Sequence, residues 1–330
     1  MLITGVTGFI GSHLASRLVT EGVAVCGVDK ATDTYSSSLR RARLDHIGDH
    51  ERFRFVEADL CDAGTVEAVF DGTRPSTVVH LAASAGVRKS LVHPEQYFAN
   101  NLTAFFNVMQ ACRTHRVGHL VYASSSSVYG STATAPFHED AAVDEPVSFY
   151  AATKRCDELM AYSFARNHGL AATGLRFFTV YGPMGRPDMA YYSFTDRYFA
   201  GEPIVVFNDG DAEHDLTRDF TYIDDIVEGV VRVLGRPATG PTPHRLFNIG
   251  NSRPVRLMDF VAELESALSG SLGRPVTIPK VFEPLRPGDV PATHACVDRL
   301  ADAVGFRPST ALADGLRRFT DWYVEFHGIS

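Results

Sequence analysis

Short apolar runs alternate with longer amphipathic stretches along the first half of the chain. The apolar runs predict strands at residues 1–4, 23–28, 53–56, 77–81, 119–123 and 171–176. Apolar positions at helical spacing predict helices at about 12–19, 95–115 and 148–167. Alternation of strand and helix is typical of a parallel sheet with helices on both faces. We therefore predict an α/β fold built on a doubly wound parallel sheet.

The pattern becomes less regular after residue 176, and the predicted elements become shorter. Helices are expected at about 191–200, 225–235, 256–269 and 310–326, and strands at 204–207, 246–249 and 276–280. We predict two parts, a first domain over residues 1–177 and a smaller C-terminal α/β region over 178–330 that mainly binds substrate. A return of the chain to the first domain around residues 220–250 is compatible with this pattern.

Composition narrows the class of ligand. Apolar residues make up 45% of the chain and charged residues 21%, with a net charge of −8 and a pI near 5.9. This balance disfavours binding to nucleic acid or to an anionic membrane surface, and no apolar run approaches the roughly 20 residues of a membrane span. The five cysteines are scattered, which indicates no metal site and predicts a reduced, cytoplasmic protein.

The first predicted strand leads into a glycine-rich turn. Gly5, Gly8 and Gly11 stand between this strand and the first helix, a context typical of dinucleotide binding. Glycines let the backbone approach a pyrophosphate, and free N–H groups at the helix start donate to it. The second strand leads to Asp29, where a carboxylate accepts from ribose hydroxyls and repels a 2′-phosphate. These features predict a Rossmann-type fold that binds NAD rather than NADP.

Other chemistry-bearing residues also follow predicted strands. Asp59 and Leu60 are candidates for the adenine edge, and the small residues from Ala82 onward leave room for a cofactor. Asn101, inside the helix that follows, is expected either to bridge backbone loops or to contact the cofactor ribose. Ligands of parallel sheets bind beyond the carboxyl ends of the strands. We therefore expect one site that collects Gly5, Asp29, Asp59, Ala82, Ser125 and Thr179.

A tyrosine and a lysine lie four residues apart at Tyr150 and Lys154, in the predicted helix at 148–167. Residues at this spacing share a helix face, so the ammonium can lie beside the phenol. A phenol with an ordinary pKa of about 10 is a poor base until a neighbouring cation favours its phenolate. With Ser125 at the end of the preceding strand, these side chains form the predicted catalytic group.

These motifs together resemble the extended short-chain dehydrogenase/reductase superfamily, in particular its NAD-dependent nucleotide-sugar epimerases and dehydratases. The resemblance covers essentially the whole chain and rests on residues 4–11, 80–83, 101, 125, 150–154, 218–225 and 286–289. It implies that NAD is bound by Gly5, Gly8, Phe9, Ile10, Gly11, Asp29, Lys30, Asp59, Leu60, Leu81, Ala82, Ala83, Asn101, Tyr150, Lys154 and Phe178. It implies that the sugar nucleotide is bound by Arg88, Ser125, Ser127, Tyr150, Thr179, Arg186, Arg218, Arg286 and Asp289.

Three local features favour one reaction within this family. The segment 124–130 carries no carboxylate, whereas the dehydratases and decarboxylases of the family carry one there. The loop 175–189 and the segment 85–88 both look like those of UDP-glucuronate 4-epimerases. We therefore predict interconversion of UDP-glucuronate and UDP-galacturonate through a 4-keto intermediate. The alternatives are a UDP-glucose/UDP-galactose 4-epimerase and a UDP-glucuronate decarboxylase, and, as other function classes, a net oxidoreductase or a non-catalytic NAD sensor.

The resemblance also implies roles and an assembly. Tyr150 removes the C4 hydroxyl proton and Ser125 hydrogen-bonds the same oxygen. Arg186, or failing that Arg88, holds the C6 carboxylate away from the geometry in which a β-keto acid loses CO₂. A homodimer is expected through the two long predicted helices, which carry an excess of apolar residues at Phe98, Phe105, Phe106, Met109, Leu159, Met160 and Phe164.

Overall fold

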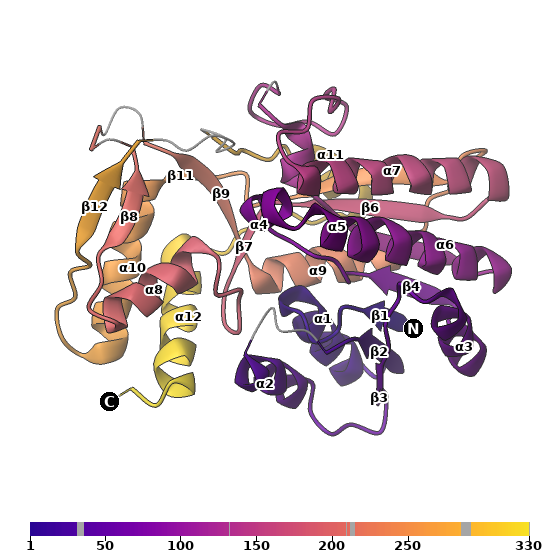
Figure 1. The fold of residues 1–330 in the computed structure, drawn as a ribbon, viewed down its shortest axis with the longest axis horizontal. Helices are drawn as coiled ribbons and strands as arrows, with labels where there is room; N and C mark the ends of the chain where they lie inside the picture. Colours follow the sequence, from indigo (N-terminus) through magenta and orange to yellow (C-terminus); the bar gives the residue numbers. More distant parts are fainter. Residues whose placement is uncertain (32–35, 132, 209, 212–214, 285–291, 330) are drawn as a thin grey trace.

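A computed structural model gives the fold of the chain (Figure 1). It describes residues 1–31, 36–131, 133–208, 210–211, 215–284 and 292–329. The predicted sites Arg286 and Asp289 lie outside these described residues.

Seven parallel strands form the main sheet, in the order β10-β6-β5-β4-β1-β2-β3. Their bounds are β1 Leu2–Thr4, β2 Val25–Asp29, β3 Phe53–Glu57, β4 Thr77–His80, β5 His119–Ser125, β6 Ala172–Phe177 and β10 His244–Ile249. The strand order changes direction between β1 and β4, which is where ligands bind in sheets of this kind. The predicted Rossmann-type fold is confirmed, and β10 brings a late part of the chain back to the edge of the sheet.

Helices cover both faces of this sheet (Figure 1). Helix α1 (Phe9–Thr20) packs against α2 (Ser37–Ile47) and α9 (Ile223–Leu234). On the opposite side, α6 (Ala104–Thr114) packs against α3 (Ala63–Thr73) and α7 (Phe149–His168). Because right-handed crossovers on the two sides of β1 run in opposite directions, they deliver helices to opposite faces. In sheets of this kind, ligands bind beyond the carboxyl ends of the strands, between the two helical layers.

The long helix expected at about 95–115 is interrupted. The segment contains α5 (Pro94–Tyr97), a π-helical stretch over Phe98–Thr103, and then α6; α4 (Val87–Val92) precedes it. A π-helix inserts an extra residue into a helix and is often found at functional sites. Here the π-helical turn contains Asn101, whose side chain is fully buried.

The remaining elements form two small sheets with helices around them. Strands β7 (Thr179–Tyr181), β9 (Thr217–Tyr222) and β11 (Pro254–Arg256) form one sheet, and β8 (Ile204–Phe207) pairs with β12 (Lys280–Glu283) in the other. Their helices are α8 (Ala190–Phe199), α10 (Leu257–Leu272), α11 (Asp298–Val304) and α12 (Leu312–Phe326). Figure 1 shows α8, α10 and α12 clustered at the far end from α3.

The prediction of a strand at 276–280 is wrong for all but its last residue, since β12 begins at Lys280. Val276 and Ile278 are buried as their apolar character suggests. Their backbone N–H groups, however, donate to the side chains of Ser269 and Glu265 on α10. Side chains of a neighbouring helix therefore replace the ladder partners that a strand would need.

Burial corrects part of the expected dimer surface. Phe105 and Met109 on α6 are fully buried and face the sheet, so neither can contact a partner. Phe98, Phe106 and Leu159 are about half exposed. Helical spacing places apolar residues on a face, but the spacing does not say which of two apolar faces meets the core. Among the described residues, the helices are all too short or too polar to span a bilayer.

Candidate functional site

The turn after β1 leaves no room for a side chain at its glycine positions. Gly5 has a positive φ of 71°, and a Cβ there would lie 2.6 Å from the backbone nitrogen of Ala82. A Cβ on Gly11 would lie 2.2 Å from the carbonyl oxygen of Gly5. Helix α1 then begins with Phe9 and Ile10, and Gly8 before it offers no side-chain cap. Bare backbone N–H groups at a helix start fit the pyrophosphate of a dinucleotide.

Asp29 is held at the end of β2 by this same turn. One carboxylate oxygen accepts hydrogen bonds from the backbone N–H and the hydroxyl of Thr7, at 2.9 and 2.6 Å, and the other accepts from the Lys30 N–H. Burial raises the pKa of Asp29, and the hydrogen bonds from Thr7 oppose that rise. The carboxylate is thus fixed beside the glycine turn, as a ribose acceptor has to be.

The expected adenine edge is a small polar network. The Lys30 ammonium donates to Asp59 at 3.0 Å and to Asn100 at 2.9 Å. Asp59 also accepts from the N–H of Cys61. Leu60 is buried, and its carbonyl accepts from Asn107, a residue that the sequence analysis did not single out. The amide side chain of Asn107, within an otherwise largely apolar helix, was the sequence feature that could have indicated this contact.

Asn101 links the loop after β4 to helix α7. Its amide oxygen accepts from the N–H of Ser84, and its amide nitrogen donates to the Ser84 carbonyl and to the Thr153 hydroxyl. Of the two expectations, bridging of backbone loops is what these bonds do, and the ribose contact stays a prediction. In the same loop, the N–H groups of Leu81 and Ala82 donate to Thr4, and Ala83 follows at the open strand end.

Ser125 lies at the end of strand β5, and Tyr150 lies at the start of helix α7. Ser125 ends β5, and its hydroxyl accepts from the Ser127 N–H and donates to the Ser127 hydroxyl at 3.2 Å. Ser148 caps α7, so Tyr150 lies in the first turn of the helix. Its N–H donates to the Ser90 hydroxyl, and its ring makes an edge contact with Tyr97 at 6.1 Å. One contact thus holds the backbone of the tyrosine, and the other holds its ring.

Lys154 is buried in the next turn of α7. Its ammonium donates to the Ala123 carbonyl and to the Asp157 carboxylate, both at 3.1 Å. The expectation placed this ammonium beside the Tyr150 phenol. Within the described part of the chain, its hydrogen bonds go to strand β5 and Asp157 instead. Asp157 is 1% exposed, and the sequence analysis missed it.

A second buried pair lies one residue further along α7. The Glu158 carboxylate accepts hydrogen bonds from Nε and one Nη of Arg176, at 2.7 and 2.9 Å, and from the Ser124 hydroxyl at 2.7 Å. Burial raises the pKa of Glu158, and the hydrogen bonds and charge of Arg176 outweigh it, so the net shift is downward. An arginine inside an otherwise apolar strand was the sequence signal for such a partner. The pair locks α7 to β5 and β6.

The sugar-binding candidates lie around β7 and the loop after it. Thr179 begins β7 and pairs with Phe220 of β9. Arg186 holds Asp188 through two hydrogen bonds, at 3.1 and 2.6 Å. The Arg88 guanidinium lies over the ring of Phe207, 5.3 Å from its centroid. Arg218 donates to the Thr217 carbonyl. Phe178, a predicted NAD contact just before β7, is packed against Tyr129 and Phe137.

Arg43 is a second residue that the sequence analysis missed. It is fully buried on α2 and donates to the carbonyls of Thr7, Met184 and Gly185 at 2.9 to 3.2 Å. One guanidinium thus joins the glycine turn to the loop that carries Arg186. Helix α2 has little apolar character, and no helix was expected there. A long-range contact of this kind leaves no local pattern.

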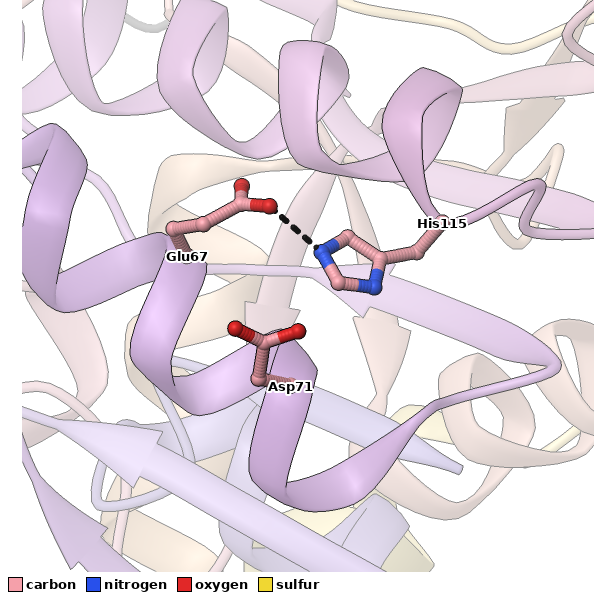
Figure 2. Close-up of side chains that lie close together, drawn as sticks. All are labelled: Glu67, Asp71 and His115. Atoms are coloured by element: carbon pink, nitrogen blue, oxygen red, sulfur yellow. Dashed lines mark hydrogen bonds and ion pairs between the residues drawn. The ribbon is translucent and has the colours of Figure 1, made fainter.

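One group of potential metal ligands lies away from this site, at the other end of α6. His115 follows α6, and its Nε2 lies 2.8 Å from a carboxylate oxygen of Glu67 on α3, with Asp71 one turn later on the same helix (Figure 2). A histidine here also meets the negative end of the helix dipole. The hydrogen-bonded pair accounts for this contact without an ion.

Comparison with known proteins identifies the family. The family model described as the NAD dependent epimerase/dehydratase family matches residues 1–250. Protein CapI of Staphylococcus aureus is 44% identical over 341 residues, covering 99% of each chain. UDP-glucuronate 4-epimerase 1 of Arabidopsis thaliana is 41% identical over 338 residues, covering 99% of this chain and 77% of that protein.

A solved structure is similar over the whole length. The crystal structure of UDP-glucuronic acid 4-epimerase from Bacillus cereus, in complex with UDP-glucuronic acid and NAD, has a TM-score of 0.88 at 30% identity and covers 98% of both chains. Sequence, fold and the glycine turn agree. The chain belongs to the NAD dependent epimerase/dehydratase family.

Proposed function

We propose that this protein is a UDP-glucuronate 4-epimerase that interconverts UDP-glucuronate and UDP-galacturonate with bound NAD. The observation that carries the proposal is the full-length likeness to the Bacillus cereus enzyme, at a TM-score of 0.88. The tight glycine turn and the fixed Asp29 carboxylate support NAD as the cofactor. When bound, NAD supplies a hydride acceptor and donor for the sugar C4.

The protein's own groups handle the proton and the sugar. Tyr150 is the base that takes the C4 hydroxyl proton and later returns it, and Lys154 supplies positive charge behind it. Ser125 orients the same hydroxyl, with Ser127 and Thr179 as further sugar contacts. Support comes from their places in the fold: Ser125 ends β5, Thr179 begins β7 directly after β6, and Tyr150 lies in the first turn of α7.

Arg186 is proposed to hold the C6 carboxylate. Its planar fork already binds a carboxylate, that of Asp188, in a two-bond arrangement, which is the geometry that guanidinium groups use for carboxylates. Arg88 is the second candidate, and its contact with Phe207 gives it a structural alternative. Arg218, Arg286 and Asp289 are proposed as nucleotide contacts on the family resemblance alone.

The reaction is tested by incubating purified protein with UDP-glucuronate and, in parallel, with UDP-glucose, with no added reductant. We expect UDP-galacturonate to form from the first and little product from the second, as followed by chromatography. A Tyr150→Phe control should keep bound NAD and lose about 10²-fold or more of the turnover, the scale of general acid–base catalysis. A clear preference for UDP-glucose would instead favour the galactose epimerase.

We also propose a homodimer that works in the cytoplasm. The exposed faces of the π-helical stretch, α6 and α7 carry Phe98, Phe106, Leu159 and Tyr162, each 43–55% exposed, and a large apolar face of this kind favours a partner. The five cysteines are all free, as a reducing compartment allows. Light scattering at micromolar concentration should give twice the chain mass of 36.1 kDa. A Leu159→Asp variant should give the single mass, and a wild-type chain that is already monomeric would contradict the assembly.

A further inference from the structure

The ammonium that the catalytic proposal relies on is already paired. Lys154 and Asp157 lie 3.1 Å apart, and both side chains are only 2% exposed. Opposite charges buried at this distance are strongly coupled because little water screens them. When Asp157 is ionised, Lys154, one helical turn after Tyr150, therefore belongs to a pair with no net charge. This pairing matters because an isolated cation is what lowers the pKa of a phenol.

The carboxylate of this pair is only half satisfied. One oxygen of Asp157 accepts from Lys154, and the other is buried without a hydrogen-bond partner among the described residues. A buried carboxylate in that state is costly to keep ionised. Burial raises the pKa of Asp157 to about 7, while the charge of Lys154 opposes the rise.

Other ionisable groups around the pair make their hydrogen bonds to other partners. Glu158 is bonded to Arg176 and Ser124, and Tyr122 is bonded to His244. Burial lowers the pKa of His80 to about 3, so this neighbour on β4 stays neutral. The groups that act electrostatically on the pair are His80 of β4, which acts on Lys154, and Glu158 and Cys156 of α7 and Tyr122 of β5, which act on Asp157. Asp157 is the group among them whose ionisation directly changes the charge at Lys154.

We propose that Asp157 is a positioning residue that sets the working pH of Tyr150, because its carboxylate fixes the Lys154 ammonium against strand β5 and offsets that ammonium's charge at the phenol. The inference rests on the proposed function for Tyr150 as base. Its sign follows from the charges. When Asp157 is ionised, the phenolate loses part of its electrostatic support; when Asp157 is protonated or replaced by a neutral residue, the phenolate regains it.

The test is an ultraviolet difference titration of the full-length, NAD-bound protein, which reports phenolate formation directly. Wild type is compared with Asp157→Asn, and each is corrected by the same protein carrying Tyr150→Phe, so that only Tyr150 contributes among the 12 tyrosines. Several of the others do not interfere, because burial raises the pKa of Tyr129 and Tyr222 to about 12 and that of Tyr122 well above its ordinary value.

We expect the Tyr150 midpoint to fall by about half a pH unit or more in Asp157→Asn, the size of a partly screened charge change at this range. Asp157→Ser, which is neutral but smaller, should shift the midpoint in the same direction. This second variant keeps the test possible if Asp157→Asn folds poorly. Asp144→Asn is the matched control. Asp144 precedes α7, its carboxylate is 79% exposed, and it lies 3.9 Å from Arg155 of α7. Its removal should leave the Tyr150 midpoint unchanged. An unchanged or higher midpoint in both Asp157 variants overturns the proposal.

The rate measurement separates this inference from the proposed function. With UDP-glucuronate, the acidic limb of the kcat/KM profile should move to lower pH in Asp157→Asn, and the two enzymes should converge well below pH 7, where wild-type Asp157 carries a proton. A uniform loss of kcat with an unmoved limb would indicate a merely structural role and count against the proposal. A midpoint shift without epimerase activity would support the positioning role and contradict the proposed reaction.

Discussion

The two ends of the candidate site hold their charged groups in different ways. At the cofactor end, the Asp29 carboxylate is bonded to the backbone and hydroxyl of Thr7 in the adjoining turn. At the sugar end, Arg186 is bonded to another side chain, the Asp188 carboxylate. A backbone partner is part of the fold and stays where it is. A side-chain partner can be exchanged for a ligand group of the same chemistry.

The difference suggests a division of labour. A cofactor that is regenerated in every cycle is best served by a rigid cradle, and Gly5 and Gly11 leave no room for variation there. A sugar that has to turn over between two hydride transfers requires contacts that can be released and remade. In the proposed role of Arg186, Asp188 would stand in for the substrate carboxylate and keep the guanidinium in a carboxylate-binding geometry before the substrate arrives.

The strongest test of this comparison removes the exchangeable cation. Arg186→Ala should weaken binding of UDP-glucuronate by roughly 10- to 150-fold, on the order of 1.5–3 kcal/mol for a charge-assisted contact, and should leave UDP-glucose binding almost unchanged. The freed carboxylate should also sample the decarboxylating geometry, so UDP-pentose should appear. Calorimetry and product chromatography measure the two effects.

The matched variant for this test is Arg186→Lys, which keeps the charge and loses the planar fork. It should recover part of the affinity while still releasing pentose, because a point charge fixes the position of a carboxylate without fixing its plane. Wild-type affinity and no pentose in Arg186→Ala would move the role to Arg88. Removal of Arg88 should then produce the same pattern.

Local patterns in the sequence were sufficient for the cofactor end. The glycine turn, Asp29 and the strand ends are short-range features, because each depends on residues within a few positions or on the period of a strand. The parallel sheet follows from their alternation. The same reasoning located Tyr150 and Lys154 on one helix, since the spacing of four is itself the geometry.

Burial and tertiary contacts could not be read in this way. Asp157 follows Lys154 by three residues and Asp188 follows Arg186 by two, so both pairs are short-range. The near-complete burial of Asp157, however, depends on packing against other elements, which spacing alone does not show. The π-helical turn around Asn101 and the late start of β12 also depend on neighbours that are distant in sequence. Tertiary contacts decide such features, so a periodic pattern alone could not have shown them.

Arg43 joins the two ends, and its removal gives the smallest functional effect that we expect to measure. Arg43→Met keeps a flexible, unbranched apolar stem but is shorter and removes the donors that reach Thr7, Met184 and Gly185. Buried carbonyls that lose a partner cost about 1–3 kcal/mol each before relaxation. The free energy of unfolding in urea should therefore fall by roughly 2–4 kcal/mol.

The functional effect should be uneven. The loop that carries Arg186 loses two of the three bonded carbonyls, whereas the glycine turn loses one and keeps its bonds to Asp29. Affinity for UDP-glucuronate should thus fall several-fold, and bound NAD should be largely retained. Arg41→Met is the control, because Arg41 is on the same helix, 78% exposed and paired only with exposed Asp45 among the described residues. Equal stability and equal sugar affinity in the two variants would show that the cofactor and sugar ends are held together by something other than Arg43.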